Sequence, residues 1–168
     1  MNSFDINSLK STETAIAQCP SSNAKLASGI CNWPHLLERN IPINLELSGP
    51  PSNNSIDIFR KRRIATFCQR ITTLDEIKAH SGSVFDLVST GGAKGLRRRD
   101  LVTIEKGKKA DFLIIDVSHP SNYPIQDYIN HVVLKASEKA VLKKFVSGKH
   151  MYVSKQQSFD KMFPTIPT

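Results

Sequence analysis

Apolar and polar positions alternate in short stretches through the first half of the chain. Residues 14–17 are mostly apolar and residues 41–47 alternate apolar with polar, which predicts two strands. Between them, residues 33–39 predict a short helix with Pro34 in its first turn, where the missing N–H costs no hydrogen bond. Strands and helices in this order are typical of an α/β fold.

A longer helix is predicted over residues 56–71, capped by Asn54 or Ser55. One set of its residues recurs at helical spacing and is expected to form the buried face: Ile56, Phe59, Arg63 with Ile64, Phe67 with Cys68, and Ile71. The basic residues at positions 60–62 fall largely off that face, so we expect them in solvent.

The second half of the chain predicts two more helical segments, at residues 74–77 and 84–96, and then strands. The glycine-rich run at 91–95 lacks the Gly-Lys-Ser/Thr ending of a phosphate-binding loop. Residues 112–117 are almost continuously apolar, which predicts a buried strand. Residues 141–152 predict a hairpin that turns around Gly148.

Two polar segments follow the first two predicted strands, at residues 18–28 and 48–55. In α/β folds, ligands bind at the carboxyl ends of the strands, because the loops there open onto one crevice. These two segments are therefore the expected ligand-facing part of the chain.

The composition of the 168-residue chain favours one globular domain with a hydrophobic core. No apolar run approaches the roughly 20 residues of a membrane helix. Asp5 and Glu13 interrupt any signal-peptide pattern at the N-terminus, so no export is expected. Three cysteines without paired spacing fit a reducing compartment, which predicts a cytoplasmic location.

The two polar segments resemble the amidohydrolase superfamily, in the branch of the chlorohydrolases and the methylthioadenosine/S-adenosylhomocysteine deaminases. Residues 18–29 read Gln-Cys-Pro-Ser-Ser-Asn-Ala-Lys-Leu-Ala-Ser-Gly, where the family has His-Cys-Pro-x-Ser-Asn-x-Lys-Leu-x-Ser-Gly. Residues 46–54 read Glu-Leu-Ser-Gly-Pro-Pro-Ser-Asn-Asn, against Gly-Thr-Asp-Gly-x-x-Ser-Asn-Asn. A third similarity is Glu-Lys-Gly-Lys-Lys-Ala-Asp at residues 105–111, a turn that leads into a strand in the family.

The resemblance covers about the last two-fifths of a typical family member and implies a partial (β/α) barrel followed by a β-sandwich portion. Residues 1–100 would be the C-terminal part of the hydrolase barrel and residues 101–153 the sandwich portion. Residues 154–168 would form a flexible tail. In the family, glycines like Gly91 and Gly92 lie in the last barrel helix and allow close packing.

The resemblance also implies that the catalytic chemistry is lost. The family uses zinc or iron to activate a water molecule. Gln18 occupies the position of the family's catalytic His, and Ser48 that of its metal-binding Asp. An amide cannot relay a proton near neutral pH, and a hydroxyl is a poor zinc ligand. We therefore expect no catalytic residue, no metal ligand and no cofactor in this chain, and the substrate-binding residues stay unknown.

Other residues offer little for a new site. The five histidines, which are His35, His80, His119, His131 and His150, show no metal-ligand spacing. Cys19 as a nucleophile would need an adjacent base, for which His35 is the nearest histidine in sequence. Asp57 is expected at the start of a helix, and Asp111 is expected to be structural.

The chain carries a formal net charge of +8, concentrated in basic clusters at residues 60–63, 97–99 and 106–109. Such clusters bind phosphate backbones, but few aromatic residues accompany them and no nucleic-acid-binding motif is present. Solvated surface charge is the favoured interpretation, and incidental nucleic-acid binding the alternative.

Three functions remain open on sequence alone. The first is the C-terminal fragment of a metal-dependent aminohydrolase, catalytically inactive by itself. The second is a subunit of a split enzyme, completed by a separate N-terminal half-barrel or by self-association, because a few strands leave open edges. The third is a non-catalytic module that binds a ligand or nucleic acid.

Overall fold

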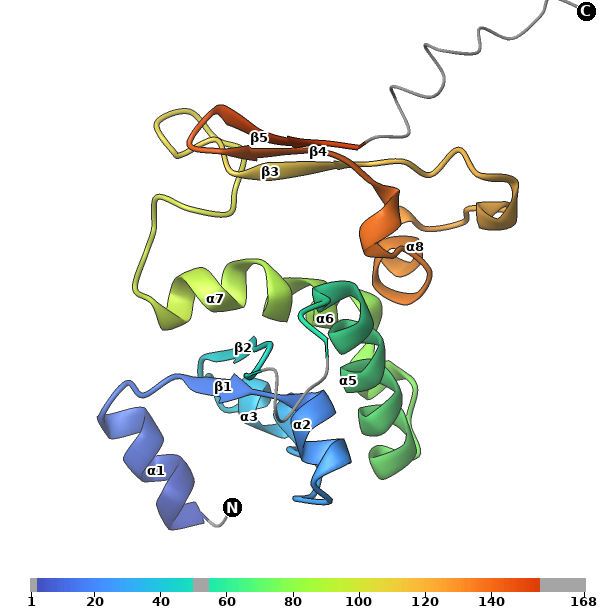
Figure 1. Cartoon of the computed structure of the whole chain (residues 1–168). Coiled ribbons are helices and arrows are strands. Elements are labelled where there is room, and N and C mark those ends of the chain that lie inside the picture. Colours follow the sequence, from blue (N-terminus) through green and yellow to red (C-terminus); the bar gives the residue numbers. More distant parts are fainter. Residues whose placement is uncertain (1–2, 50–54, 155–168) are drawn as a thin grey trace, which may run out of the picture.

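The computed structural model describes residues 3–49 and 55–154 of the chain. Its first part is built of short helices around a two-stranded parallel sheet (Figure 1). Helix α1 (Ser3–Ser11) precedes strand β1 (Ile16–Gln18), and helices α2 (Pro20–Lys25) and α3 (Trp33–Glu38) lead to strand β2 (Ile43–Leu45). The two strands and the helix predicted at 33–39 are confirmed. The segment after β1, expected as a polar loop, begins with the helix α2, and Pro20 is its first residue.

The sheet buries one of its two faces, the one that carries the apolar side chains of alternate residues. Ile16 pairs with Ile43 and Gln18 with Leu45 in a parallel register. Ile43 and Leu45 belong to a core completed by residues of α1, α3, α5, α6 and α8: Ile6, Trp33, Leu36, Ala65, Val84, Leu87 and Val133, with Ile41 and Ala79. Side chains two residues apart in a strand share a face, so helices cover one side of the sheet. Ala17 is exposed on the opposite side.

Helix α5 (Ile58–Thr73) shows that the predicted burial of this segment was wrong. Ile56 before the helix and Ile71 within it are 74% and 73% exposed. The buried positions are instead mostly polar: Phe59, Lys61, Arg62, Ala65, Thr66 and Gln69. Phe59 is the one apolar residue of the predicted face that is fully buried, and Asp57 caps the helix by accepting a hydrogen bond from the Phe59 backbone N–H at 2.8 Å. Asn54 lies outside the described residues.

Close backbone packing joins α7 (Thr90–Gly95) to the sheet. It follows α6 (Ser81–Val88), so the single helix predicted at 84–96 is divided into two. A Cβ atom at Gly91 would lie 2.5 Å from the carbonyl oxygen of Ile43 in β2. The interpretation of this glycine as a close-packing residue is confirmed. The helix predicted at 74–77 is displaced to a 3₁₀ turn, η1 (Ile77–Ala79).

The second part of the chain is a three-stranded antiparallel sheet in the order β3–β4–β5 (Figure 1). Strand β3 (Phe112–Ile115) pairs with β4 (Val141–Val146), and β4 forms the predicted hairpin with β5 (Lys149–Val153). Gly148 takes the left-handed conformation in the turn, with φ at +75°. Asp111 accepts a hydrogen bond from the backbone N–H of Ser147, which supports its structural role.

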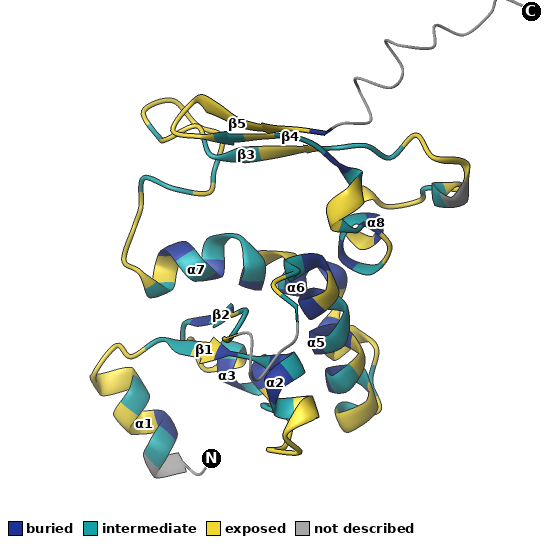
Figure 2. Cartoon of the chain, in the orientation of Figure 1, coloured by how far each residue is buried: buried dark blue, intermediate teal, exposed yellow. Residues whose placement is uncertain are grey.

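This sheet is open to solvent along much of its surface (Figure 2). The strand predicted at 112–117 is confirmed as β3, but its predicted burial was wrong, because Leu113 and Ile114 are 44% and 41% exposed. Between β3 and β4, helix α8 (Tyr128–Leu134) packs against α5 and α6 and joins the sheet to the helical part. The described residues contain one sheet here rather than a sandwich. The division at residue 100 stays a prediction, and the predicted tail lies outside the described residues after Ser154. None of the helices described is long and apolar enough to cross a membrane.

Candidate functional site

The structure brings the ends of the two predicted ligand-facing segments together. Because β1 and β2 are parallel, their carboxyl ends lie at one edge of the sheet. The backbone N–H of Glu46 donates a hydrogen bond to the carbonyl oxygen of Gln18 at 2.8 Å, immediately where the two strands end. The edge expected to carry chemistry therefore exists, with Gln18 on one strand and residues 46–49 leaving the other.

Gln18 is buried at this edge, with 4% of its surface exposed. It follows Ile16 by two residues and pairs with Leu45, so it lies on the side of the sheet that the helices cover. Its side-chain oxygen Oε1 is buried and has no hydrogen-bond partner within residues 3–49 and 55–154. An amide held in this way accepts or donates a hydrogen bond, but it carries no proton that titrates near neutral pH.

Ser48 lies beyond the end of β2 in the left-handed conformation, with φ at 58°. Its hydroxyl favours the thiolate form of Cys19, the residue that follows Gln18. The left-handed conformation is one that Asp and Asn adopt more readily than most residues, so the backbone itself does not require a serine.

Three charged or polar groups set the protonation of Cys19. Burial raises the pKa of the thiol, and the Glu46 carboxylate raises it further. Lys61 and the hydroxyl of Ser48 act in the opposite direction, by favouring the thiolate. Since the balance raises the pKa, the thiol stays protonated at neutral pH and is a weak nucleophile.

His35 is not the base that a nucleophilic cysteine would need. Its Nδ1 lies 2.8 Å from Nη1 of Arg39, which follows it by four residues at the end of α3. The groups that act on the Cys19 thiol are Glu46, Lys61 and Ser48, and His35 is not among them. The structure therefore gives no support to a cysteine–histidine pair.

The metal chemistry of the family has no matching residues in the part of the chain that the structure describes. Within residues 3–49 and 55–154, no group of three His, Cys, Asp or Glu side chains is placed to hold a metal ion. His80 hydrogen-bonds through Nε2 to the Ser83 hydroxyl at 2.7 Å. His131 is buried in α8, and burial followed by the charge of Lys135 lowers its pKa. These residues do not fit a zinc or iron centre.

Lys61 and Glu46 are also part of this edge, which the sequence did not predict. Lys61 was expected in solvent, yet it is 1% exposed and its charge reaches Cys19. Burial lowers its pKa, and the charge of Arg60 lowers it further. The residues at 61, 65 and 69 are spaced to share one face of a helix, which could have indicated that Lys61 is buried. Because they are small or polar, this face has the composition of a solvent-exposed surface.

Comparison with known proteins agrees with this geometry. The sequence profile of the amidohydrolase family matches residues 1–151. The chain belongs to the amidohydrolase family. The resemblance seen at the two polar segments is therefore confirmed.

The chain corresponds to about the C-terminal third of its relatives. It is 32% identical over 152 residues to a 5-methylthioadenosine/S-adenosylhomocysteine deaminase of Pelotomaculum thermopropionicum. The aligned region covers 90% of this chain and 35% of that protein. A deaminase of the same name from Thermococcus kodakarensis is 34% identical over 149 residues, covering 89% and 35%. The chain therefore spans only about a third of the length of these relatives.

Solved structures show the same arrangement of elements. A zinc-bound adenosine deaminase from Xanthomonas campestris superposes with a TM-score of 0.87 at 26% identity, covering 92% of this chain and 36% of that one. An atrazine chlorohydrolase from Arthrobacter aurescens superposes with a TM-score of 0.85 at 17% identity, covering 92% and 35%. The second likeness shows the fold alone.

Proposed function

We propose that this chain is a catalytically inactive part of an amidohydrolase-family deaminase. The ancestral reaction is metal-dependent hydrolysis of a non-peptide C–N bond, in the deamination of a purine-like or triazine-like ring. One observation carries the proposal. At the carboxyl edge of β1 and β2, the residue in the family's metal-binding Asp position is Ser48, a neutral hydroxyl that acts on the thiol of Cys19.

The physical argument rests on what the replaced groups can do. A carboxylate binds a divalent metal and accepts a proton from its bound water, whereas a serine hydroxyl is neutral at pH 7 and does neither. Gln18 keeps a hydrogen-bonding function and loses proton transfer. No other described residues supply a metal site, so this edge retains the shape of an active site without its chemistry.

Activity and metal content test the proposal together. The purified chain is incubated with zinc or ferrous iron, and ammonia release is measured with 5-methylthioadenosine, S-adenosylhomocysteine and adenosine. We expect no turnover and no stoichiometric metal by elemental analysis. The double variant Gln18→His with Ser48→Asp is expected to remain inactive, because the other ligands are not among the described residues. Turnover by either protein contradicts the proposal.

The second candidate is a subunit of a split enzyme, and the edges of the sheet favour it. Within the described residues, β1 pairs only with β2, and β2 only with β1. Two strands with free outer edges are marginal in water and form pairing sites for other strands. The same argument applies to β3–β5, which we propose as one part of a sandwich completed by strands from elsewhere.

Complementation distinguishes the two candidates. The first two-thirds of the Pelotomaculum thermopropionicum deaminase would be co-expressed with this chain, and the complex tested for zinc and deamination. The inactive-part proposal predicts no deamination even if the two chains associate, because Ser48 remains. Deamination by the wild-type complex would instead establish the split enzyme. In that experiment Ser48→Asp is the matched variant that should restore a metal ligand.

A further inference from the structure

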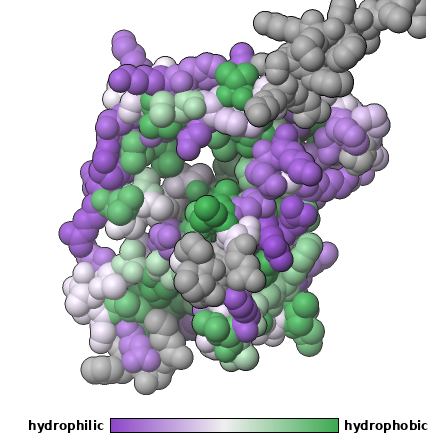
Figure 3. All heavy atoms as spheres, viewed as in Figure 1, coloured by the Kyte–Doolittle hydropathy of each residue, from purple (hydrophilic) through white to green (hydrophobic). Residues whose placement is uncertain are grey.

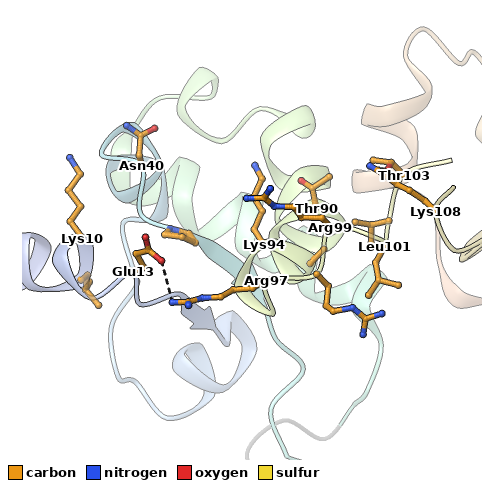
Figure 4. A pocket seen from close by; sticks show the side chains of 15 residues that line it. Lys10, Glu13, Asn40, Thr90, Lys94, Arg97, Arg99, Leu101, Thr103 and Lys108 are labelled. Carbon is orange, nitrogen blue, oxygen red and sulfur yellow. Dashed lines mark hydrogen bonds and ion pairs between the residues drawn. The ribbon is translucent and has the colours of Figure 1, made fainter. Parts of the chain in front are cut away.

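A basic pocket lies at the opposite edge of the sheet from Gln18 and Ser48. Its volume is about 750 Å³. Glu13 and Pro42, which precede β1 and β2, line it, so it opens at the amino ends of the strands. Its walls are α1, α7 and the segment of residues 97–108 that follows α7 (Figure 4). The molecule is strongly hydrophilic along the outer edge where this segment runs (Figure 3).

Positive charge dominates the lining of the pocket. Its basic side chains come from α1 and from the stretch of residues 94–108: Lys10, Lys94, Arg97, Arg98, Arg99 and Lys108. Among the residues that the structure describes, Glu13 is the only acidic one that lines it. The fold therefore gathers the basic cluster at 97–99 and part of the cluster at 106–109 into one concave site, whereas the third cluster is partly buried in α5.

Only part of this charge is neutralised within the chain. Arg98 forms a close ion pair with Asp100 at 2.6 Å. Lys108 pairs with Glu105 at 3.0 Å. Arg97 and Glu13 are 3.4 Å apart, but both side chains are more than 70% exposed, so solvent screens the pair.

The remaining three cations of the pocket have no ion pair within the described residues: Lys10, Lys94 and Arg99. Lys10 lies across the pocket from Lys94 and Arg99 (Figure 4). Like charges held around one concavity repel one another, and an anion bound between them relieves that repulsion. The arrangement therefore favours a ligand with several negative charges close together.

We propose that this pocket binds a compact polyphosphate group, either free or as part of a nucleoside polyphosphate. Arginine and lysine bind phosphate oxygens through charge-assisted hydrogen bonds. The pocket has the volume of a small-molecule site. It has no aromatic lining on which the bases of a nucleic acid strand could stack. Apolar residues such as Leu9 and Leu101 form part of the lining and lower the local dielectric, which strengthens these contacts.

Calorimetry on the full chain at low salt tests the proposal. The ligands are inorganic pyrophosphate, inorganic triphosphate, ATP, adenosine and a short single-stranded oligonucleotide. We expect pyrophosphate, triphosphate and ATP to bind, adenosine to give no heat, and binding to weaken as salt is raised. Equal affinities for triphosphate and ATP identify the phosphate group as the ligand, and a tighter ATP complex identifies a nucleoside polyphosphate.

Matched variants locate the site. Lys94→Ala with Arg99→Ala should weaken pyrophosphate binding about tenfold or more, because two charged donors are lost. Arg60→Ala with Lys139→Ala removes the same charge at exposed positions outside the pocket and should change binding by less than about twofold. Glu13→Gln removes the only acid of the lining and should strengthen binding about threefold, an effect that misfolding cannot imitate.

Three outcomes overturn the proposal. The first is no heat with pyrophosphate or triphosphate at low salt. The second is equal weakening by the pocket variant and the surface control, which means non-specific attraction to net charge. The third is an oligonucleotide that binds more tightly than triphosphate and is indifferent to Lys94 and Arg99, which means an extended nucleic-acid surface. None of these depends on whether the chain retains deaminase chemistry.

Discussion

A Cβ atom on Gly91 would lie 2.5 Å from the carbonyl oxygen of Ile43, closer than any side chain can approach a backbone atom without displacing it. Ile43 is in the centre of the core, so neither β2 nor α7 moves easily. Gly91→Ala is therefore expected to lower the free energy of unfolding by about 1–3 kcal/mol, as overpacking does elsewhere. Chemical denaturation followed by circular dichroism measures the change.

The next residue provides the control. A Cβ atom at Gly92 would have no neighbour within 4 Å. Because alanine is a better helix former than glycine, Gly92→Ala should leave stability unchanged or raise it by about 0.5–1 kcal/mol. If both substitutions destabilise the chain equally, the close contact between α7 and β2 is not the cause.

Arg62 leads to a prediction of the opposite sign. It is 3% exposed, and its Nε and Nη2 have no hydrogen-bond partner among the described residues. Burial, with a smaller effect of Arg63, lowers its pKa to about 10. Its guanidinium lies 4.0 Å from the ring centre of Phe59, which offsets part of the cost. Arg62→Met should therefore raise the free energy of unfolding by about 1 kcal/mol, since an apolar side chain often improves on a buried unpaired charge.

The pH dependence gives the Arg62 prediction a second measurement. A basic group with a lowered pKa in the folded state binds fewer protons there than in the unfolded chain. Stability is then expected to rise with pH above about 10, toward the higher pKa of an ordinary arginine. Arg62→Met should flatten this rise, whereas Arg60→Met, at an exposed position of the same helix, should not. A clear loss of stability in Arg62→Met would show that the guanidinium has partners that offset its burial.

The Cys19 thiol reports on the edge where the ancestral site lay. The Glu46 carboxylate disfavours the thiolate and raises the pKa of Cys19. Glu46→Gln should therefore lower that pKa and increase the rate of alkylation at pH 8. Iodoacetamide labelling against pH, in a Cys31→Ser, Cys68→Ser background, measures the midpoint. Glu38→Gln is the control, because Glu38 pairs with Lys78 away from this thiol. An unchanged midpoint in Glu46→Gln would place the carboxylate too far away to act.

The strands and their carboxyl edge were predictable because their signals are local. Alternation over a few residues predicted β2, a short apolar run predicted β1, and the turn at Gly148 predicted the hairpin of β4 and β5. The motifs around Gln18 and Ser48 pointed to the edge where β1 and β2 end. The face of α5 was not predictable by the same rule. Phe67 and Ile71 have the spacing of a buried stripe, but α5 packs against α2, α6 and α8, and the residues that it buries include Lys61 and Gln69. Tertiary packing overrode the amphipathic pattern.

Substitutions on α5 test this orientation directly. Phe59 is 5% exposed in a small core with Ala136 and Val141. Phe59→Ala should cost about 3–5 kcal/mol of stability. Ile71→Gln, at a residue that is 73% exposed, should change stability by less than about 0.5 kcal/mol. The sequence pattern alone predicts a comparable loss for both, so urea denaturation of the two variants separates the two orientations of the helix.

His131 provides a further prediction in the mildly acid range. It is buried in α8, its Nδ1 has no hydrogen-bond partner in the described part of the chain, and burial lowers its pKa below the ordinary value of 6.5. The unfolded chain then takes up a proton near pH 6.5 that the folded chain resists, so stability is lost as the pH falls below that value. The carboxylates with lowered pKa, such as Asp100 and Asp116, lose their contributions only at lower pH. His131→Gln should therefore reduce the loss of stability between pH 7 and pH 5, and His150→Gln, at an exposed histidine of β5, should leave it unchanged. Thermal melts across this range measure both, and an identical pH dependence in the two variants would remove His131 as its source.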